Sequence, residues 1–100
     1  MYVVLVDYTA PLAEVDYSLP DHIEWLGRQY EAGHFLASGR RVDHAGDVIV
    51  TRPMVREKLT ALLATDPWVR LRLVHYQIVE FQATRTAREL AACNEAVPSR

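Results

Sequence analysis

The stretch TDPWVRLRLVHYQIVEF, residues 65–81, runs from an Asp-Pro pair into a long segment rich in β-branched and aromatic residues. Because such residues favour extended structure, we predict a strand over 72–81. Side chains alternate between the two faces of a strand. Its apolar residues are Val74, Tyr76 and Ile78 on one face and Leu73, Val79 and Phe81 on the other. Both faces of this strand therefore need to be covered.

The first third of the chain predicts a buried strand followed by a helix. The β-branched run over 2–6 is typical of a strand buried on both faces. A helix is expected over 19–32, with Ser18 as its N-cap and Gly33 just after its end. The residues of its predicted apolar stripe are Leu19, Ile23, Leu26 and Tyr30.

Two short strands and a second helix are expected next. Residues 34–42 and 47–51 predict strands joined by a tight turn. Thr51 is predicted to cap the second helix, whose apolar stripe begins at Val55. This helix should end near Thr65, because the residue before a proline is driven out of the helical region.

The predicted order β-α-β-β-α-β is typical of the α+β, ferredoxin-like fold, an antiparallel four-stranded sheet with both helices on one face. We expect this domain over 1–84, and a C-terminal extension over 85–100 with a short helix near 86–94. Two helices cover only one face of the sheet. The other face also needs a cover, so we predict a homodimer packed sheet to sheet. The alternative is a monomer whose C-terminal segment folds over this face.

Composition excludes several classes of function. The 100 residues suit one domain, and a net charge of −2 provides no basic surface for nucleic acid or an anionic membrane. Cys93 is the only cysteine, so no intramolecular disulfide or thiolate metal cluster can form. No signal-like or membrane-spanning segment is present, so we expect a cytoplasmic protein. The glycines lack phosphate-binding spacing, and no cofactor is expected.

The predicted topology brings two ionisable residues to one edge of the sheet. His22 lies in the first turn of the first helix, and Asp66 follows the second helix. A carboxylate bonded to one ring nitrogen of a histidine fixes the tautomer and raises the basicity of the other nitrogen. The pair is therefore a candidate for general acid–base catalysis, with Asp43 or Asp47 at the same edge as the next choice for the carboxylate. The structural alternative is a histidine satisfied by the backbone and an aspartate that only turns the chain before Pro67.

Further polar residues are expected at the same edge. Ser38, Gly39 and Arg40 end the second strand there, and Trp68 is close enough to form a wall of a pocket. A metal held by His22, His44 and an aspartate is not expected, because the chain has no closely spaced pair of histidines.

These residues carry a resemblance to a known family. His22-x3-Leu26, GHFLASGRR, DVIV, LLATDPWV and YQIVEF together resemble the YCII-like (YciI-like) family over about residues 1–84. The resemblance implies a dimeric α+β barrel and a site centred on His22 and Asp66. Family members include a dehydrochlorinase that acts on a chlorinated hydroxyquinol. Many members have SGP where this chain has Ser38-Gly39-Arg40, so the basic pair Arg40-Arg41 would favour an anionic ligand here if both guanidinium groups point inward.

The resemblance leaves two functions open. The first is a His/Asp-dependent lyase or isomerase acting on a small cyclic or phenolic substrate. The second is a non-catalytic dimeric module that binds a small ligand or a partner protein.

Overall fold

The computed structural model describes residues 1–96 of the chain. The elements are β1 (Tyr2–Tyr8), α1 (Leu12–Tyr17), α2 (Leu19–Glu31), β2 (Phe35–Arg40), β3 (Gly46–Thr51), α3 (Arg56–Leu63), α4 (Pro67–Arg70), β4 (Val74–Glu80) and the 3-10 helix η1 (Arg88–Cys93). The four strands form one antiparallel sheet in the order β2-β3-β1-β4. The predicted α+β, ferredoxin-like fold is confirmed.

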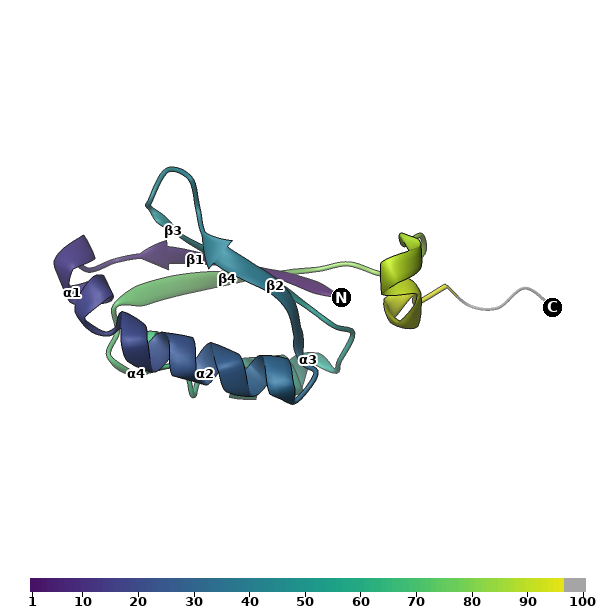
Figure 1. The fold of residues 1–100 in the computed structure, drawn as a ribbon, viewed down its shortest axis with the longest axis horizontal. Coiled ribbons are helices and arrows are strands. Elements are labelled where there is room, and N and C mark those ends of the chain that lie inside the picture. The colour runs from purple at the N-terminus through teal and green to yellow at the C-terminus, as the bar shows by residue number, and fades with distance from the viewer. Residues whose placement is uncertain (97–100) are drawn as a thin grey trace.

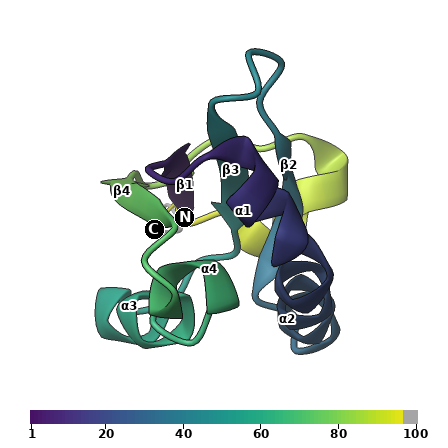
Figure 2. The ribbon, with the colours of Figure 1, turned by 90° about the vertical axis from the view of Figure 1, so that its left-hand side faces the viewer.

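The helices α2, α3 and α4 lie on one side of the sheet, whereas α1 lies at one end of it (Figure 1 and Figure 2). Alternation along β1 directs Tyr2, Val4 and Val6 toward this helical layer, and all three are buried. Val4 pairs with Ile49 on one side and with Ile78 on the other, so β3, β1 and β4 share one apolar face. This face and the inner sides of α2 and α3 form the main core.

The buried side of α2 differs from the predicted stripe. His22, Trp25 and Gln29 are buried, whereas Ile23 is 55% exposed and Tyr30 is 39% exposed. The face toward the sheet is therefore rotated by about one residue from the aliphatic positions. The rings of His22 and Trp25 pack inward, and each has a hydrogen-bond partner there, Asp66 for His22 and Thr65 for Trp25. His22 consequently lies within the buried face of the helix and not at its border.

The predicted cap at Thr51 is wrong, whereas Ser18 is the N-cap residue of α2 as predicted. Thr51 stays in β3, where pairing with Tyr2 and Phe35 keeps its backbone extended, so α3 starts only at Arg56. Val55, expected in the buried stripe, is 68% exposed before the helix. Ser18 joins two helices, because the unpredicted helix α1 precedes it, and its side chain makes no capping hydrogen bond.

The segment before β4 also differs from the prediction. Residues Pro67–Arg70 form the short helix α4, which Asp66 caps. Arg72 then has a φ of 58°, in the left-handed region, so extended structure starts at Val74 and not at Arg72.

The second face of the sheet has no helical cover in the described chain. Val3, Leu5, Val48 and Val50 point to this face and are half-buried, and Val79 is 41% exposed. The C-terminal helix η1 lies beyond one end of the sheet and not across its face (Figure 1). The alternative of a C-terminal segment that folds over the open face is therefore not found for residues up to 96.

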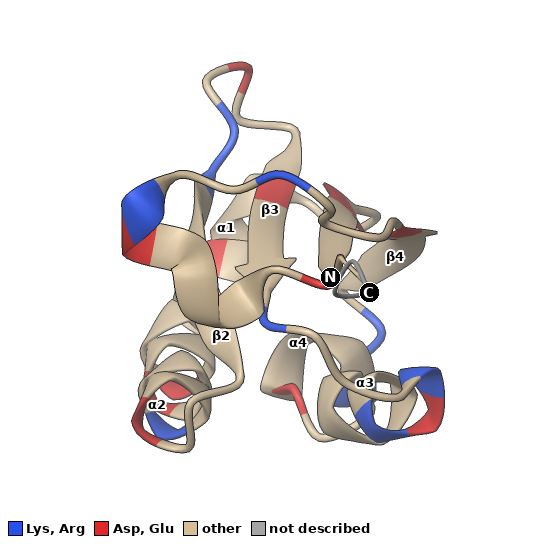
Figure 3. Cartoon of the chain, turned by 90° about the vertical axis from the view of Figure 1, so that its right-hand side faces the viewer, with Lys and Arg blue, Asp and Glu red and all other residues tan. Residues whose placement is uncertain are grey.

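The remaining surface is mixed in charge. Figure 3 shows acidic and basic residues interspersed over α2 and α3, as on the solvated faces of amphipathic helices. Among residues 1–96, no helix has the length and apolar character needed to span a membrane.

Candidate functional site

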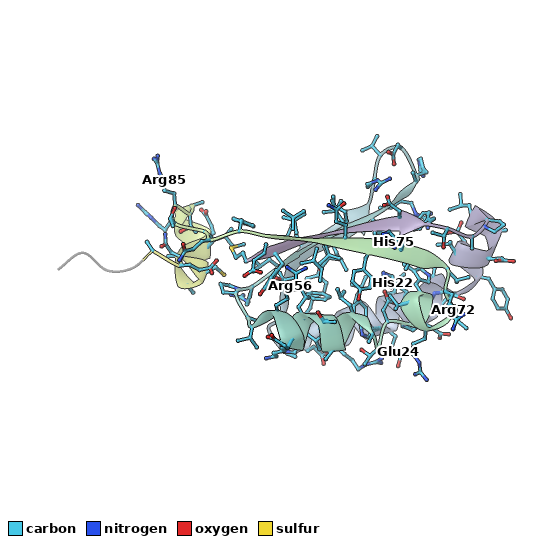
Figure 4. All side chains as sticks on the ribbon, turned by 180° about the vertical axis from the view of Figure 1, so that it is seen from behind. His22, Glu24, Arg56, Arg72, His75 and Arg85 are labelled. Carbon is cyan, nitrogen blue, oxygen red and sulfur yellow. The ribbon has the colours of Figure 1, made fainter. Side chains whose placement is uncertain are left out.

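His22 and Asp66 form a buried pair at the edge where α2 begins and α3 ends. Nδ1 of His22 lies 2.8 Å from Oδ1 of Asp66, and the exposed fractions of the two side chains are 1% and 3%. The same carboxylate oxygen accepts the backbone N–H of Trp68 at 3.0 Å and so caps α4. The predicted contact is confirmed. Figure 4 shows His22 between the helical layer and the sheet.

The contacts of Asp66 define the tautomer of His22. Because Oδ1 of Asp66 already accepts one backbone N–H, it acts as an acceptor toward the imidazole as well. We therefore assign the proton of the neutral ring to Nδ1, which leaves the lone pair on Nε2. Among residues 1–96, Nε2 of His22 is the one buried side-chain nitrogen or oxygen without a hydrogen-bond partner. Such unpaired polar atoms are rare in protein interiors, and they are a common feature of catalytic sites.

Two tryptophans hold the imidazole ring in place. The ring of Trp68 stacks on that of His22 with 3.6 Å between centroids and 7° between planes, and Trp25 lies 5.7 Å away. The indole N–H of Trp68 donates to the carbonyl of Val15 at 3.1 Å, and that of Trp25 donates to Thr65 at 2.8 Å. The imidazole therefore has little freedom to rotate.

The prediction that Trp68 walls a pocket needs correction. Its side chain is completely buried beneath the histidine ring. Stacking on His22 leaves no face of the indole for a ligand, so Trp68 supports His22 and does not line the pocket.

A second carboxylate lies on the other side of His22. Oδ2 of Asp47 is 3.9 Å from Nε2, which is longer than a hydrogen bond. The Tyr8 hydroxyl donates to Oδ1 of Asp47. Arg40 donates from Nε to the Tyr8 oxygen at 2.8 Å and from Nη2 to Asp16 at 2.6 Å. This chain of contacts, here called the Asp47 network, consists of Asp47, Tyr8, Arg40 and Asp16.

Sequence reasoning named Asp47 only as an alternative to Asp66, and it assigned no site role to Tyr8 or Asp16. Alternation along β1 could have found Tyr8, since Tyr8 shares a face with Val6. Asp16 lies on α1, an element that was not predicted.

Burial of Tyr8 and its hydrogen bond to the Asp47 carboxylate raise the pKa of the phenol from 10.0 to about 12, although Arg40 opposes the shift. The unfolded chain therefore releases this proton at lower pH than the folded chain. Between pH 10 and 12 the contribution of Tyr8 to the free energy of unfolding should fall as pH rises. Tyr8→Phe should lack this pH-dependent contribution. We expect urea unfolding to show a larger drop in the free energy of unfolding for the wild type than for Tyr8→Phe between about pH 9.5 and about pH 11.5, and an equal drop in both proteins would contradict the prediction.

An open pocket of about 310 Å³ adjoins His22. It is lined by Leu19, His22, Ile23, Leu26, Ser38, Gly39, Arg40 and Asp47. The structure thus brings Ser38, Gly39 and Arg40 to His22, as their placement at one edge predicts. The hydroxyl of Ser38 is 2.6 Å from that of Tyr30. A binding role for these three residues stays a prediction.

Metal binding finds no geometric support in the described part of the chain. No group of three or more His, Cys, Asp or Glu side chains in residues 1–96 is placed to hold a metal ion. His44, the other histidine considered, is exposed in the β2–β3 turn with a φ of 60°.

The fold and the buried pair define a small α+β protein with a histidine-containing pocket at the edge of its sheet. The chain belongs to the family of the YCII-related domain, whose family model matches residues 1–82.

A similar solved structure is the 5-chloro-2-hydroxyhydroquinone dehydrochlorinase TftG from Burkholderia phenoliruptrix, in complex with 2,5-dihydroxybenzoquinone. The match has a TM-score of 0.64 and 12% sequence identity, and it covers 81% of this chain and 93% of the other. At this identity the likeness shows the fold. No curated protein matches the sequence.

Proposed function

We propose that this protein is a lyase or isomerase that uses His22 as a general base, with Asp66 as its orienting partner, on a small cyclic or phenolic substrate. The observation that carries the proposal is the buried Nε2 atom. It has a lone pair in the assigned tautomer, lacks a hydrogen-bond partner among residues 1–96, and belongs to a residue that lines the pocket. The family and the fold shared with a dehydrochlorinase support the same class of chemistry.

The geometry suits transfer of a hydroxyl proton. Nε2 of His22 would accept the proton of a substrate hydroxyl, and the resulting imidazolium would lie 2.8 Å from one carboxylate oxygen and 3.9 Å from another. Both carboxylates favour this charged intermediate. If the reaction is loss of HCl, chloride leaves from the keto tautomer of the chlorinated phenol, in which the carbon that bears chlorine is tetrahedral. A remaining hydroxyl gives its proton to Nε2, its O–H electron pair forms a carbonyl, the ring double bond shifts to the carbon that bears chlorine, and the carbon–chlorine electron pair leaves with chloride. The step then balances without an oxidant or reductant.

Access to Nε2 requires a movement of the pocket wall. The atom is closed to water, and the His22 side chain is only 1% exposed. A substrate oxygen can reach it only after a lining side chain shifts. The same closure excludes water from the proton-transfer site, which strengthens the electrostatic interactions within it.

The burial of Nε2 also favours one alternative. In that alternative the protein is a non-catalytic module that binds a small ligand in the open, outer part of the pocket. In that case the pair would serve stability, because His22 and Asp66 join α2 to the start of α4.

The proposed function is tested by measuring chloride release from chlorinated hydroxyhydroquinones, together with isomerisation of unchlorinated phenolic ketones. Turnover by the wild-type protein supports the enzyme. Binding of these compounds without turnover by any of them would contradict the catalytic proposal and favour the binding module.

We also propose that two chains pair through the open faces of their sheets. The half-buried Val3, Leu5, Val48 and Val50 and the exposed Val79 form an apolar surface that the described chain does not cover. A stable interface of this kind buries more than about 1,000 Å² in total, which a sheet face can supply.

Light scattering at micromolar concentration should therefore give a mass twice the 11.4 kDa of one chain. Val79→Glu should yield monomer or aggregate, because a carboxylate would be buried without a partner in the interface. Val55→Glu is the matched control, since Val55 is 68% exposed beside α3. A monomeric wild-type mass would rule out the sheet-to-sheet dimer.

A further inference from the structure

We infer that Asp47 and His22 form a two-acceptor subsite that selects a ligand group able to donate hydrogen bonds, a hydroxyl or an ammonium, over a carboxylate. The inference rests on the proposed function only in taking the His22 pocket as the place where the ligand binds. It names the class of substrate that the pocket accepts.

The first argument is the hydrogen-bonding character of the two atoms. Nε2 of His22 carries a lone pair, because the ring proton is on Nδ1 toward Asp66. Oδ2 of Asp47, 3.9 Å away, is a carboxylate oxygen that makes no other hydrogen bond within residues 1–96. A single ligand group with two donors, such as an ammonium, can donate to both of these acceptors. Two neighbouring hydroxyls of one ring can also donate, one to each acceptor. A ligand carboxylate would add a third acceptor and no donor.

The second argument is the rigid placement of Asp47. The Tyr8 hydroxyl donates to Oδ1, and Arg40 donates in turn to the Tyr8 oxygen. Tyr8 stays protonated at neutral pH because burial and the Asp47 carboxylate raise the pKa of its phenol. Oδ2 therefore remains the atom directed toward Nε2, since Oδ1 is held by the tyrosine.

The third argument is charge. The guanidinium of Arg40 does not face the pocket as a free cation, because Asp16 pairs with it at 2.6 Å. Of the four side chains Asp16, Arg40, Asp47 and Asp66, three are carboxylates and only one is a cation. The expectation that Arg40 favours an anionic ligand is thus replaced by a preference for neutral or cationic groups.

The test compares three probes that share one unsubstituted phenyl ring and differ in one group: benzylamine, benzyl alcohol and benzoate. At neutral pH they present an ammonium, a hydroxyl and a carboxylate, and none carries a second hydrogen-bond donor on the ring. Calorimetric or NMR titration of the wild-type protein should show the ammonium bound at least ~10-fold more tightly than the carboxylate, with the alcohol between them.

Asp47→Asn removes the charge and keeps the oxygen that accepts from Tyr8. It should lower the ratio of ammonium to carboxylate affinity by ~10-fold or more, because the carboxylate charge that lines the pocket is lost. Asp21→Asn is the matched control, since Asp21 is an exposed carboxylate on α2 outside the pocket lining. In that variant the ratio should change by less than about twofold.

Three results would overturn the inference: benzoate bound as tightly as benzylamine, an unchanged affinity ratio in Asp47→Asn, or no binding of any probe at about 10 mM. These outcomes concern binding alone. Absence of turnover with the expected order of affinities would overturn only the proposed function, and turnover with the reversed order would overturn only the subsite.

Discussion

Replacement of His22 by alanine should lower turnover of a true substrate by ~10²–10⁴-fold, the usual contribution of a general acid–base residue. The physical reason is the loss of Nε2, the buried atom that has a lone pair and no partner among residues 1–96. The measurement is kcat/KM on a substrate found by the chloride-release or isomerisation assay. His34→Ala is the matched control, because that ring contacts Gln29 and does not line the pocket.

Loss of the ring also removes packing against Trp68, so folding must be measured beside activity. His22→Gln is a second variant that keeps a polar side chain of similar length toward Asp66. Added imidazole should partly restore turnover in His22→Ala, because the space between Trp68 and Trp25 matches the missing ring. A folded His22→Ala protein with wild-type kcat/KM would contradict the catalytic role, as would a folded, inactive one that imidazole does not rescue.

Replacement of Gly46 by alanine should destabilise the fold by ~3 kcal/mol or more, at the upper end of what overpacking costs. Gly46 is the first residue of β3 and pairs with Asp7 of β1. A Cβ atom there would lie 1.8 Å from the backbone oxygen of Val6 and 3.2 Å from the Arg41 guanidinium. The central strands would have to separate to accommodate it. Because Asp47 follows directly, the same shift should displace the carboxylate from His22.

The matched control for Gly46→Ala is Gly27→Ala, an exposed glycine within α2 with no atom within 4 Å of the added methyl group. That substitution should stabilise the protein by ~0.5–1 kcal/mol, because alanine has the higher helix propensity. Urea unfolding curves of the two variants should therefore shift in opposite directions. A Gly46→Ala protein as stable as the wild type would show that β1 and β3 do not approach as closely as described.

The sequence by itself determined the order of the main elements and the meeting of His22 with Asp66. The strands over 2–6 and 72–81 are predicted from local runs of β-branched and aromatic residues, and proline and glycine mark where helices end. With the topology known, His22 and Asp66 had to share one edge, since one helix begins where the other ends. The 2.8 Å contact between them agrees with this reasoning.

Only the tertiary structure decided which atoms surround the imidazole. Trp68 was expected at a pocket wall, and its indole instead lies under His22, because the Asp66 cap forms the helix α4 and turns that ring inward. Arg40 was expected to attract an anion, yet Asp16 neutralises it from the unpredicted helix α1. These outcomes depend on side chains distant in sequence that compete for the same partners. No local sequence pattern predicts which of these partners will pair. In the folded protein the pairing is the one that leaves buried polar atoms hydrogen-bonded.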